Sequence, residues 1–306
     1  MAAKNKNKGT VGVIGLGIMG GAFAKNLAAA GWRVIGYDPS AARCGAARRA
    51  GVELAKDAAD VAAKAPIILV SLPKPEALHF TARKIATAKL PRRLIVEMST
   101  FMIEDKAKAE AVLRKAGQVM LDCPVSGTGS QAKTRDLVFY ASGDAKSIKR
   151  LRPVFKDLGR HVYDVGTFGN GSRMKYVANL LVAINNVASA EAMVLGMKAG
   201  LPPQLIFDLI RGGAGNSRVF ELRAPMMVKN RYDDVTMKIE VWQKDMQVIG
   251  DFAKKIRVKT PLFTATEAIY HKAMTSGHAT DDTAAVCAVL ERMAGFKRSQ
   301  VRSKTR

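Results

Sequence analysis

Val11-Gly-Val-Ile-Gly15-Leu-Gly17-Ile-Met-Gly20-Gly opens the stretch that decides the fold of this chain, and Asp38 closes it. A short apolar run leads into the pattern Gly-x-Gly-x-x-Gly, and a helical run follows. A second apolar run, residues 33–37, then ends next to the acid. This order predicts a strand, a tight turn, a helix and a second parallel strand, as in a doubly wound α/β sheet.

Each glycine of the turn has a physical role if the segment binds a dinucleotide. Gly15 allows the sharp turn, Gly17 lets the backbone approach a pyrophosphate, and Gly20 lets the helix pack closely on the sheet. An acid at position 38 would accept hydrogen bonds from the adenosine ribose hydroxyls and repel a 2′-phosphate. The stretch therefore predicts binding of NAD, preferred over NADP, by Gly15, Leu16, Gly17, Ile18, Met19, Gly20 and Asp38.

The pattern along the chain predicts two domains. The 306 residues, 48% of them hydrophobic, are enough for about two cores. Strands and helices alternate as far as a glycine-rich segment at 166–171, and only helical patterns follow. The predicted fold class is α/β. We expect a Rossmann-type NAD(P)-binding domain over 1–168, with a basic tail at 1–9, joined by a long interdomain helix to an all-helical substrate and oligomerisation domain over 169–306, with a basic tail at 297–306.

Composition and charge exclude several other classes. The three cysteines and four histidines show no metal-ligand spacing, so we expect no metal and reduced thiols in a cytoplasmic protein. The first residues lack the apolar segment of a secretory signal, and the longest apolar span carries three asparagines and a glutamate, so no membrane span is expected. The net charge of +23 predicts a basic solvated surface rather than a nucleic-acid partner, because no aromatic and basic residues interleave.

Hydroxyl-bearing residues follow two buried strands of the predicted sheet. Ser71 and Leu72 come directly after one apolar run, and Ser99 and Thr100 follow the next. Ligands of doubly wound folds bind at the carboxyl edge where such strands end. We therefore expect Ser71, Leu72 and Thr100 to contact the cofactor, although Thr100 could equally cap a helix.

The next apolar strand runs into a segment of two glycines among hydroxyl residues, Ser126-Gly127-Thr128-Gly129-Ser130. Backbone N–H groups of such a loop can turn inward together and bind a carboxylate or a phosphate. A plain connecting turn is the alternative. The first interpretation predicts Ser126, Gly127 and Thr128 as substrate-binding residues.

A polar face runs along the first helix of the predicted second domain. Lys175, Asn179, Ala183 and Asn186 share this face, because about 100° separates successive residues of a helix. An apolar stripe that includes Val177 lies opposite. A buried cation and two buried amides need partners, which predicts either a site or a structural lysine.

Four ordered motifs resemble the β-hydroxyacid dehydrogenase family, which includes 3-hydroxyisobutyrate and 6-phosphogluconate dehydrogenases. The motifs are Gly15-Leu-Gly-Ile-Met-Gly20, Asp122-Cys-Pro-Val-Ser-Gly127, Gly171-Ser-Arg-Met-Lys175-x-x-x-Asn179 and Lys244-Asp245. The resemblance covers residues from about 10 to 293. It implies an NAD(P)-dependent oxidoreductase of a small 3-hydroxy acid, with homodimers or homotetramers formed through the helical domain.

The resemblance also implies roles for individual residues. Lys175 is similar to the family's general acid/base, and Asn179 to the residue that orients the substrate and the lysine. Ser126 to Thr128 occupy the loop that holds the substrate carboxylate, and Lys244 lies on the cofactor side of the cleft. Burial beside an oxidised nicotinamide would favour the neutral amine that a general base needs.

Two departures from the family pattern concern the substrate. A threonine stands at 128 where the family has a further glycine, and Arg135 stands in a segment that the family fills with small residues. One interpretation is that both suit a more polar substrate than 3-hydroxyisobutyrate. The alternative for Arg135 is that its side chain is simply exposed. Two alternatives stay open: an NADPH-dependent semialdehyde reductase, and a non-catalytic nucleotide-sensing or nucleic-acid-associated protein that keeps the fold.

Overall fold

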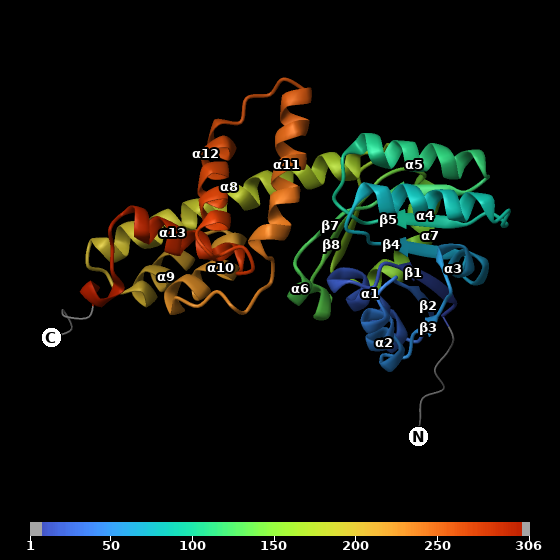
Figure 1. Ribbon diagram of the computed structural model, residues 1–306, viewed down its shortest axis with the longest axis horizontal. Coiled ribbons are helices and arrows are strands. Elements are labelled where there is room, and N and C mark those ends of the chain that lie inside the picture. The colour runs from blue at the N-terminus through green and yellow to red at the C-terminus, as the bar shows by residue number, and fades with distance from the viewer. Residues whose placement is uncertain (1–7, 302–306) are drawn as a thin grey trace. The chain divides into compact units, whose positions relative to one another are not determined.

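The computed structural model describes residues 8–301 of the chain (Figure 1). The chain forms two compact units, Met1–Lys175 and Tyr176–Arg306. The boundary between them falls within one long helix, α8 (Asn170–Lys198). The first unit is α/β and the second is helical, so the predicted fold class is confirmed.

A six-stranded parallel sheet forms the centre of the first unit, in the order β3-β2-β1-β4-β5-β6. The order reverses direction at β1, whose neighbours are β2 and β4. This is the switch point at which doubly wound sheets bind ligands. The strands are β1 (Thr10–Ile14), β2 (Arg33–Tyr37), β3 (Glu53–Leu54), β4 (Ile67–Val70), β5 (Leu94–Glu97) and β6 (Val119–Asp122).

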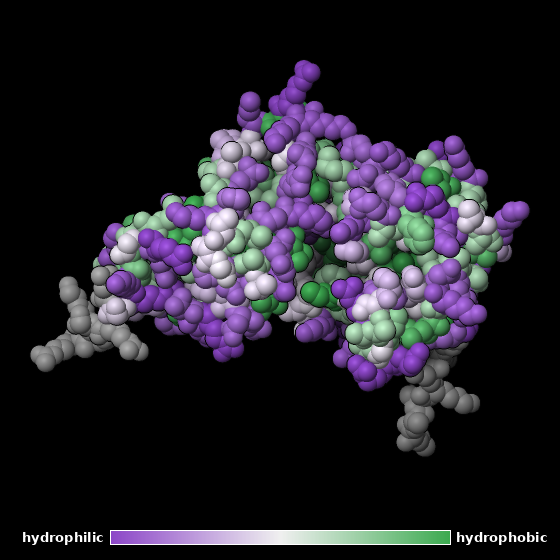
Figure 2. All heavy atoms as spheres, in the orientation of Figure 1, coloured by the Kyte–Doolittle hydropathy of each residue, from purple (hydrophilic) through white to green (hydrophobic). Residues whose placement is uncertain are grey.

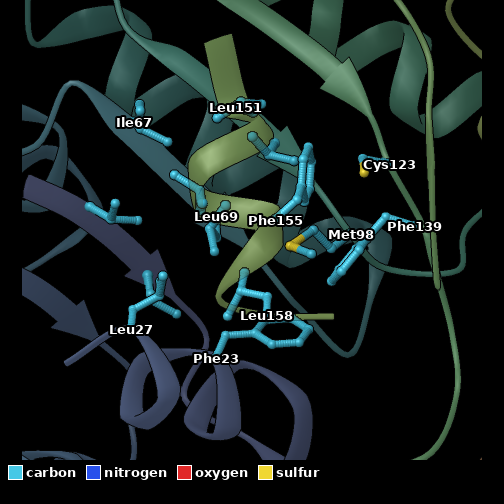
Figure 3. Close-up of a cluster of buried hydrophobic side chains, with 14 of the residues drawn as sticks. Phe23, Leu27, Ile67, Leu69, Met98, Cys123, Phe139, Leu151, Phe155 and Leu158 are labelled. Atoms are coloured by element: carbon cyan, nitrogen blue, oxygen red, sulfur yellow. The ribbon is translucent and has the colours of Figure 1, made fainter. Parts of the chain in front are cut away.

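Alternate side chains of these strands pack into two hydrophobic cores, one on each face of the sheet. Ile67 and Leu69 of β4 belong to one core, together with Phe23 of α1 and Phe155 of α7 (Figure 3). Ile68 and the other residues on the opposite face pack with α3, α4 and α5. Both faces are therefore covered by helices, as the continuous apolar runs predict.

The helices of the first unit lie in the connections between the strands. They are α1 (Ile18–Ala29), α2 (Ala41–Arg49), α3 (Ala58–Lys64), α4 (Pro75–Thr87), α5 (Ile103–Lys115), α6 (Gly129–Lys133) and α7 (Ala145–Lys156). Figure 1 shows α4 and α5 side by side over the sheet.

The last strands depart from the mostly parallel sheet that the sequence predicts. They form a second sheet of three strands, β7 (Val125–Ser126), β8 (Val138–Ala141) and β9 (His161–Asp164), in which β7 pairs with β8 antiparallel. The short connection through α6 turns the chain back on itself, which a parallel pairing does not allow.

The second unit consists of helices around the larger part of α8. They are α9 (Pro203–Arg211), α10 (Arg218–Lys229), α11 (Ile239–Lys255), α12 (Pro261–Thr275), α13 (Val286–Met293) and the short 3₁₀ helices η1 (Thr283–Ala285) and η2 (Arg298–Val301). A buried ion pair joins two of its segments, with Arg223 Nη1 2.7 Å from Asp282 Oδ1.

By length and composition, α8 would suffice to cross a membrane, a test that the core helix of a soluble protein also passes. Asn179, Ala183 and Asn186, on one face of α8, are buried. The two amides also bond within the second unit. We therefore assign α8 as a core helix, as the sequence predicts.

Each end of the described chain includes a basic residue of a predicted tail that forms an ion pair. Lys8 pairs with Asp157 at 2.8 Å, and Arg298 pairs with Glu291 at 2.5 Å, because a carboxylate lies within reach of each. Residues 1–7 and 302–306, which carry the remaining charges of both tails, lie outside the described residues. Elsewhere hydrophilic side chains cover much of the face seen in Figure 2, as the high charge predicts.

Candidate active site

The glycine turn after β1 has the backbone geometry that its residues predict. Gly15 has φ +89°, and a Cβ there would collide with the carbonyl oxygen of Ser71. A Cβ on Gly20 would collide with the carbonyl oxygen of Gly15. These two positions therefore require glycine, and they bring the turn against the end of β4.

The space above Gly17 is open. Gly17 is the N-cap of α1, without a side-chain cap, and the nearest atom to a Cβ built on it is Arg43 Nη1 at 3.9 Å. The first N–H groups of a helix have no acceptor within the helix, and they carry partial positive charge. The turn therefore fits the pyrophosphate of a dinucleotide, which would lie against α1.

Asp38 lies just beyond the end of β2 and is buried. Its Oδ2 accepts a hydrogen bond from Leu16 N–H at 2.8 Å, and its Oδ1 accepts one from Ser40 N–H at 2.9 Å. Arg43 Nη1 lies 3.4 Å from Oδ2. The carboxylate thus joins the glycine turn to the end of β2, where an adenosine ribose is bound in this fold.

Ser71, Leu72, Ser99 and Thr100 lie together at the carboxyl edge of the sheet, because β4 and β5 are neighbours. Ser71 N–H donates to the Ile14 carbonyl at 2.9 Å, which ties it to the end of β1. Ser99 Oγ accepts a hydrogen bond from Leu72 N–H at 2.9 Å. Thr100 is half-buried beside Ser99. Hydrogen bonds therefore connect the ends of β1, β4 and β5 at the edge that is predicted to face the cofactor.

The predicted carboxylate-binding segment connects a short strand to a short helix. Ser126 ends β7, and α6 begins at Gly129. Thr128 caps this helix: its N–H donates to Gln131 Oε1 at 3.0 Å, and its Oγ1 lies 2.9 Å from Ser130 Oγ. A threonine at 128 therefore serves the helix start, a use that the capping pattern with a glutamine three residues later could have revealed.

This segment lies directly against the glycine turn. Gly127 has φ +136°, and a Cβ on it would lie 2.5 Å from Leu137 Cδ2. A Cβ on Gly129 would collide with Cγ2 of Ile18, the first residue of α1. Asn26 of α1 donates to the Ala132 carbonyl at 2.8 Å. The predicted cofactor and substrate segments are therefore neighbours within the first unit.

Polar groups of α8 are buried where the sequence predicts them. Lys175 and Asn179, one turn apart, are both buried, as are Ala183 and Asn186. In the second unit, Asn179 Nδ2 donates to Asp245 Oδ2 at 2.9 Å, and Asn186 Nδ2 donates to the Tyr270 hydroxyl and to the Thr283 carbonyl, each at 2.9 Å. The predicted polar face is therefore a buried one.

Lys244 and Asp245 lie on α11 of the second unit. Lys244 Nζ is 3.5 Å from Asp245 Oδ1, and its side chain is partly exposed. Asp245 therefore contacts both the neighbouring lysine and Asn179. This carboxylate is a site residue that the sequence analysis named only as part of a motif.

A second group of residues at the sheet edge includes two that the sequence did not reveal, Lys106 and Glu97. Asp122 ends β6, and its carboxylate accepts hydrogen bonds from Ser172 N–H and Oγ–H, both at 2.8 Å. Lys106 of α5 is buried against Asp122 and Glu97. An acid at the end of a buried apolar strand needs a partner, and this signal could have pointed to the lysine.

No group of three or more His, Cys, Asp or Glu side chains able to hold a metal ion occurs within residues 8–301. The candidate residues described so far, taken unit by unit, supply backbone N–H groups, hydroxyls, amides, carboxylates and lysines. These groups are suited to binding anions and to moving a proton.

Comparisons with known proteins match this geometry over nearly the whole chain. Residues 10–166 match the family described as the NAD binding domain of 6-phosphogluconate dehydrogenase. Residues 169–290 match the family described as NAD-binding of NADP-dependent 3-hydroxyisobutyrate dehydrogenase.

Individual relatives give the same picture. An L-threonate dehydrogenase of Cupriavidus necator is 31% identical over 90% of this chain and 94% of its own. A glyoxylate/succinic semialdehyde reductase of Arabidopsis thaliana is 26% identical over 92% of this chain and 79% of its own. The structure of Mycobacterium tuberculosis 3-hydroxyisobutyrate dehydrogenase with L-serine is 29% identical, covers 92% of this chain and 98% of that chain, and has a TM-score of 0.84.

Proposed function

The chain belongs to the β-hydroxyacid dehydrogenase family, and we propose that it oxidises a small 3-hydroxy acid with NAD, or runs the reverse reaction, with Lys175 as the general acid/base. As a member of this family it is an NAD(P)-dependent oxidoreductase that acts on the CH–OH group of a hydroxy acid. The resemblance predicted from four motifs is thereby confirmed.

The observation that carries the proposal is the burial of Lys175 and Asn179 one turn apart on α8. Removing a lysine from water costs free energy, so a buried lysine needs partners that stabilise it. In the first turn of the same helix, the Ser172 N–H group donates a hydrogen bond to the Asp122 carboxylate, three residues before Lys175. This fixes the start of the helix that carries the proposed acid/base.

The proposed roles divide the reaction among the residues. When bound, the nicotinamide accepts or returns the hydride. Lys175 takes the proton of the substrate hydroxyl, and Asn179 orients substrate and lysine. The backbone of Ser126 to Thr128 binds the substrate carboxylate, and Lys244 contacts the cofactor. The turn from Gly15 to Gly20 and α1 hold the pyrophosphate.

For the substrate we propose a 3-hydroxyisobutyrate-like acid first and L-threonate second. Relatives carry both names, and both acids have a hydroxyl near a carboxylate. In the sequence, Thr128 and Arg135 indicate a more polar substrate. The Thr128 side chain is already bonded to Ser130, and Arg135 is exposed with φ +60°, so neither favours the more polar acid.

For the cofactor we propose NAD rather than NADP. The supporting observation is the buried Asp38 carboxylate at the end of β2, whose charge opposes a 2′-phosphate. Arg33, the other arginine near the end of the predicted fingerprint, forms an exposed ion pair with Glu53 at 2.7 Å. Arg43, beside Asp38, favours the alternative of an NADPH-dependent semialdehyde reductase.

We also propose that the protein is a homodimer or homotetramer through its helical unit. Val177, Leu181 and Leu195 of α8 are 54%, 53% and 73% exposed, although the sequence stripe to which the first two belong is apolar. A second copy would bury such residues. Light scattering coupled to gel filtration tests this, and a monomeric mass at micromolar concentration would contradict it.

For the cellular location we propose the cytoplasm. Cys44, Cys123 and Cys287 are free thiols, which suits a reducing compartment. Fractionation of cells that express the full chain tests the proposal, and recovery of the protein outside the cytosolic fraction would contradict it.

A substrate panel tests the proposed reaction. The purified protein is assayed with 3-hydroxyisobutyrate, L-threonate and further 3-hydroxy acids, each with NAD and with NADP, by the absorbance of the reduced nicotinamide. We expect turnover with at least one hydroxy acid and faster turnover with NAD. No turnover with any acid, while the same preparation reduces a semialdehyde with NADPH, would favour the alternative.

A further inference from the structure

Lys106 of α5 is the only lysine among the fully buried side chains of largest volume in the described chain, and it is 0% exposed. Its Nζ donates to Asp122 Oδ1 at 2.8 Å and to the Ser99 carbonyl at 2.7 Å. It also lies 2.6 Å from Glu97 Oε2, an ion pair without hydrogen-bond geometry. One cation therefore serves two buried carboxylates at the carboxyl ends of β5 and β6.

Glu97 and Ser99 lead from Lys106 to the edge that faces the proposed cofactor. Glu97 Oε1 accepts a hydrogen bond from Ser99 N–H at 2.9 Å. Ser99 Oγ in turn accepts one from Leu72 N–H at 2.9 Å. The position of Leu72 thus depends, through two bonds, on the carboxylate that Lys106 neutralises.

Asp122 leads from Lys106 to the proposed catalytic helix. Its two oxygens accept both hydrogen bonds of Ser172, at 2.8 Å each, and Ser142 Oγ lies 3.2 Å from Oδ2. Ser172 stands in the first turn of α8, three residues before Lys175. The start of this helix therefore depends on Asp122 staying an acceptor.

Charge makes this dependence strong. Burial alone would lower the pKa of the Lys106 ammonium, but the facing carboxylates of Asp122 and Glu97 outweigh burial and raise it, so the lysine stays charged. Without this cation two carboxylates would share a site closed to water, and one of them would take up a proton. A protonated carboxyl oxygen becomes a donor and is a weaker acceptor for the N–H group that it now holds.

We propose that Lys106 is a positioning residue of the dehydrogenase site, which keeps Leu72 and Ser99 in place for the cofactor and the first turn of α8 in place for Lys175. The part of this inference that concerns Lys175 rests on the proposed function. Lys106 acts only through Glu97, Asp122 and the Ser99 carbonyl. Displacements of about 1 Å in such supports can lower turnover roughly 10²-fold.

The first test replaces the lysine by an apolar side chain of similar length. Lys106→Met should lower kcat by roughly tenfold to a hundredfold and weaken NADH binding severalfold in folded protein. The matched control is Arg223→Met, which removes the buried ion pair between Arg223 and Asp282 of the second unit. If both variants lose the same stability and both keep wild-type kcat and NADH affinity, the proposal is wrong.

A double variant separates positioning from stability. Lys106→Met with Glu97→Gln removes one positive and one negative charge, so the cluster keeps its net charge. We expect thermal stability to recover toward wild type while kcat stays low, because the Ser99 carbonyl and Asp122 still lack their donor. Joint recovery of stability and kcat would mean that Lys106 has only a structural role.

Two substitutions of single hydroxyl groups test the two roles separately if the Lys106 variants do not fold. Ser172→Ala should lower kcat with little change in the NADH dissociation constant, measured by fluorescence. Ser99→Ala should weaken NADH binding more than it lowers kcat. Unchanged values in both variants contradict the proposal. If the wild type binds NADH but turns over no hydroxy acid, the proposed function fails. The NADH affinities of Ser99→Ala and Lys106→Met then still decide whether Lys106 supports the cofactor side of the site.

Discussion

The Asp38 carboxylate accepts a hydrogen bond from Leu16 N–H at 2.8 Å, so the acid at the end of β2 directly holds the glycine turn at the end of β1. A second bond, from Ser40 N–H at 2.9 Å, fixes its other oxygen. The residue proposed to select the cofactor therefore also shapes the turn that binds it.

Substituting Asp38→Ala should weaken NADH binding about tenfold or more, because hydrogen bonds to a charged group contribute about 1.5–3 kcal/mol each. NADPH binding should suffer less, since the negative charge that opposes its 2′-phosphate is removed. Fluorescence titration with both cofactors measures the two constants. An equal loss of affinity for NADH and NADPH would mean that Asp38 only shapes the turn and does not select the cofactor. Arg43→Ala serves as the control for the neighbouring charge.

Removal of the proposed acid/base should abolish turnover. Lys175→Ala is expected to lower kcat by roughly 10²- to 10⁴-fold, the usual contribution of a general acid or base, and to leave NADH binding nearly unchanged. Lys175→Arg should also be inactive, because a guanidinium does not give up its proton. Steady-state kinetics on the best substrate decides this, and wild-type turnover in either variant would refute the role.

The hydrogen bond between Asn179 and Asp245 predicts that two substitutions of Asp245 lower kcat/KM to different extents. Asp245→Ala leaves the buried Asn179 amide without its acceptor, which costs about 1–3 kcal/mol, so kcat/KM should fall about tenfold or more. Asp245→Asn can still offer an oxygen to Asn179 and should fall less. Equal activities of the two variants would show that the acceptor does not matter.

Asp157 predicts a pH dependence of stability. Burial alone would raise the pKa of its carboxyl, but hydrogen bonds from Lys8 and Trp32 outweigh burial and lower it. A lowered folded-state pKa stabilises the protein above the unfolded value of about 4 and loses this effect as pH falls through the folded value. Urea unfolding should therefore show Asp157→Asn less stable by about 1 kcal/mol at neutral pH, with a smaller difference in acid. A difference that is independent of pH would argue against the ionised contact.

The three cysteines should react with iodoacetamide in a fixed order. Burial raises the pKa of the Cys123 thiol, and burial with the nearby Glu291 raises the pKa of Cys287 to about 12. Cys44 is only half-buried, and its Sγ lies 3.1 Å from the Asp38 carbonyl. Mass spectrometry at neutral pH should find Cys44 labelled first, and NAD should slow that labelling. Earlier modification of Cys123 would contradict the packing described.

Local patterns in the sequence determined most of the sheet. Apolar runs bounded by turns predict β1, β2, β4, β5 and β6. The glycines at positions 15 and 20 of the turn follow from a close backbone approach that only glycine allows. Short elements such as β7 and α6 were missed, because two to five residues carry too little periodicity.

The sequence by itself determined the cofactor turn, the acid beside it and the spacing of Lys175 and Asn179, because each depends on residues close together in the chain. Only the tertiary structure decided which distant groups bond: Lys106 with Glu97 and Asp122, Ser172 with Asp122, and Asn179 with Asp245. Such partners lie up to 66 residues apart, and only packing brings them within bonding distance. Burial then makes each of these bonds obligatory, since an unpaired charge or amide away from water costs several times what an exposed one does.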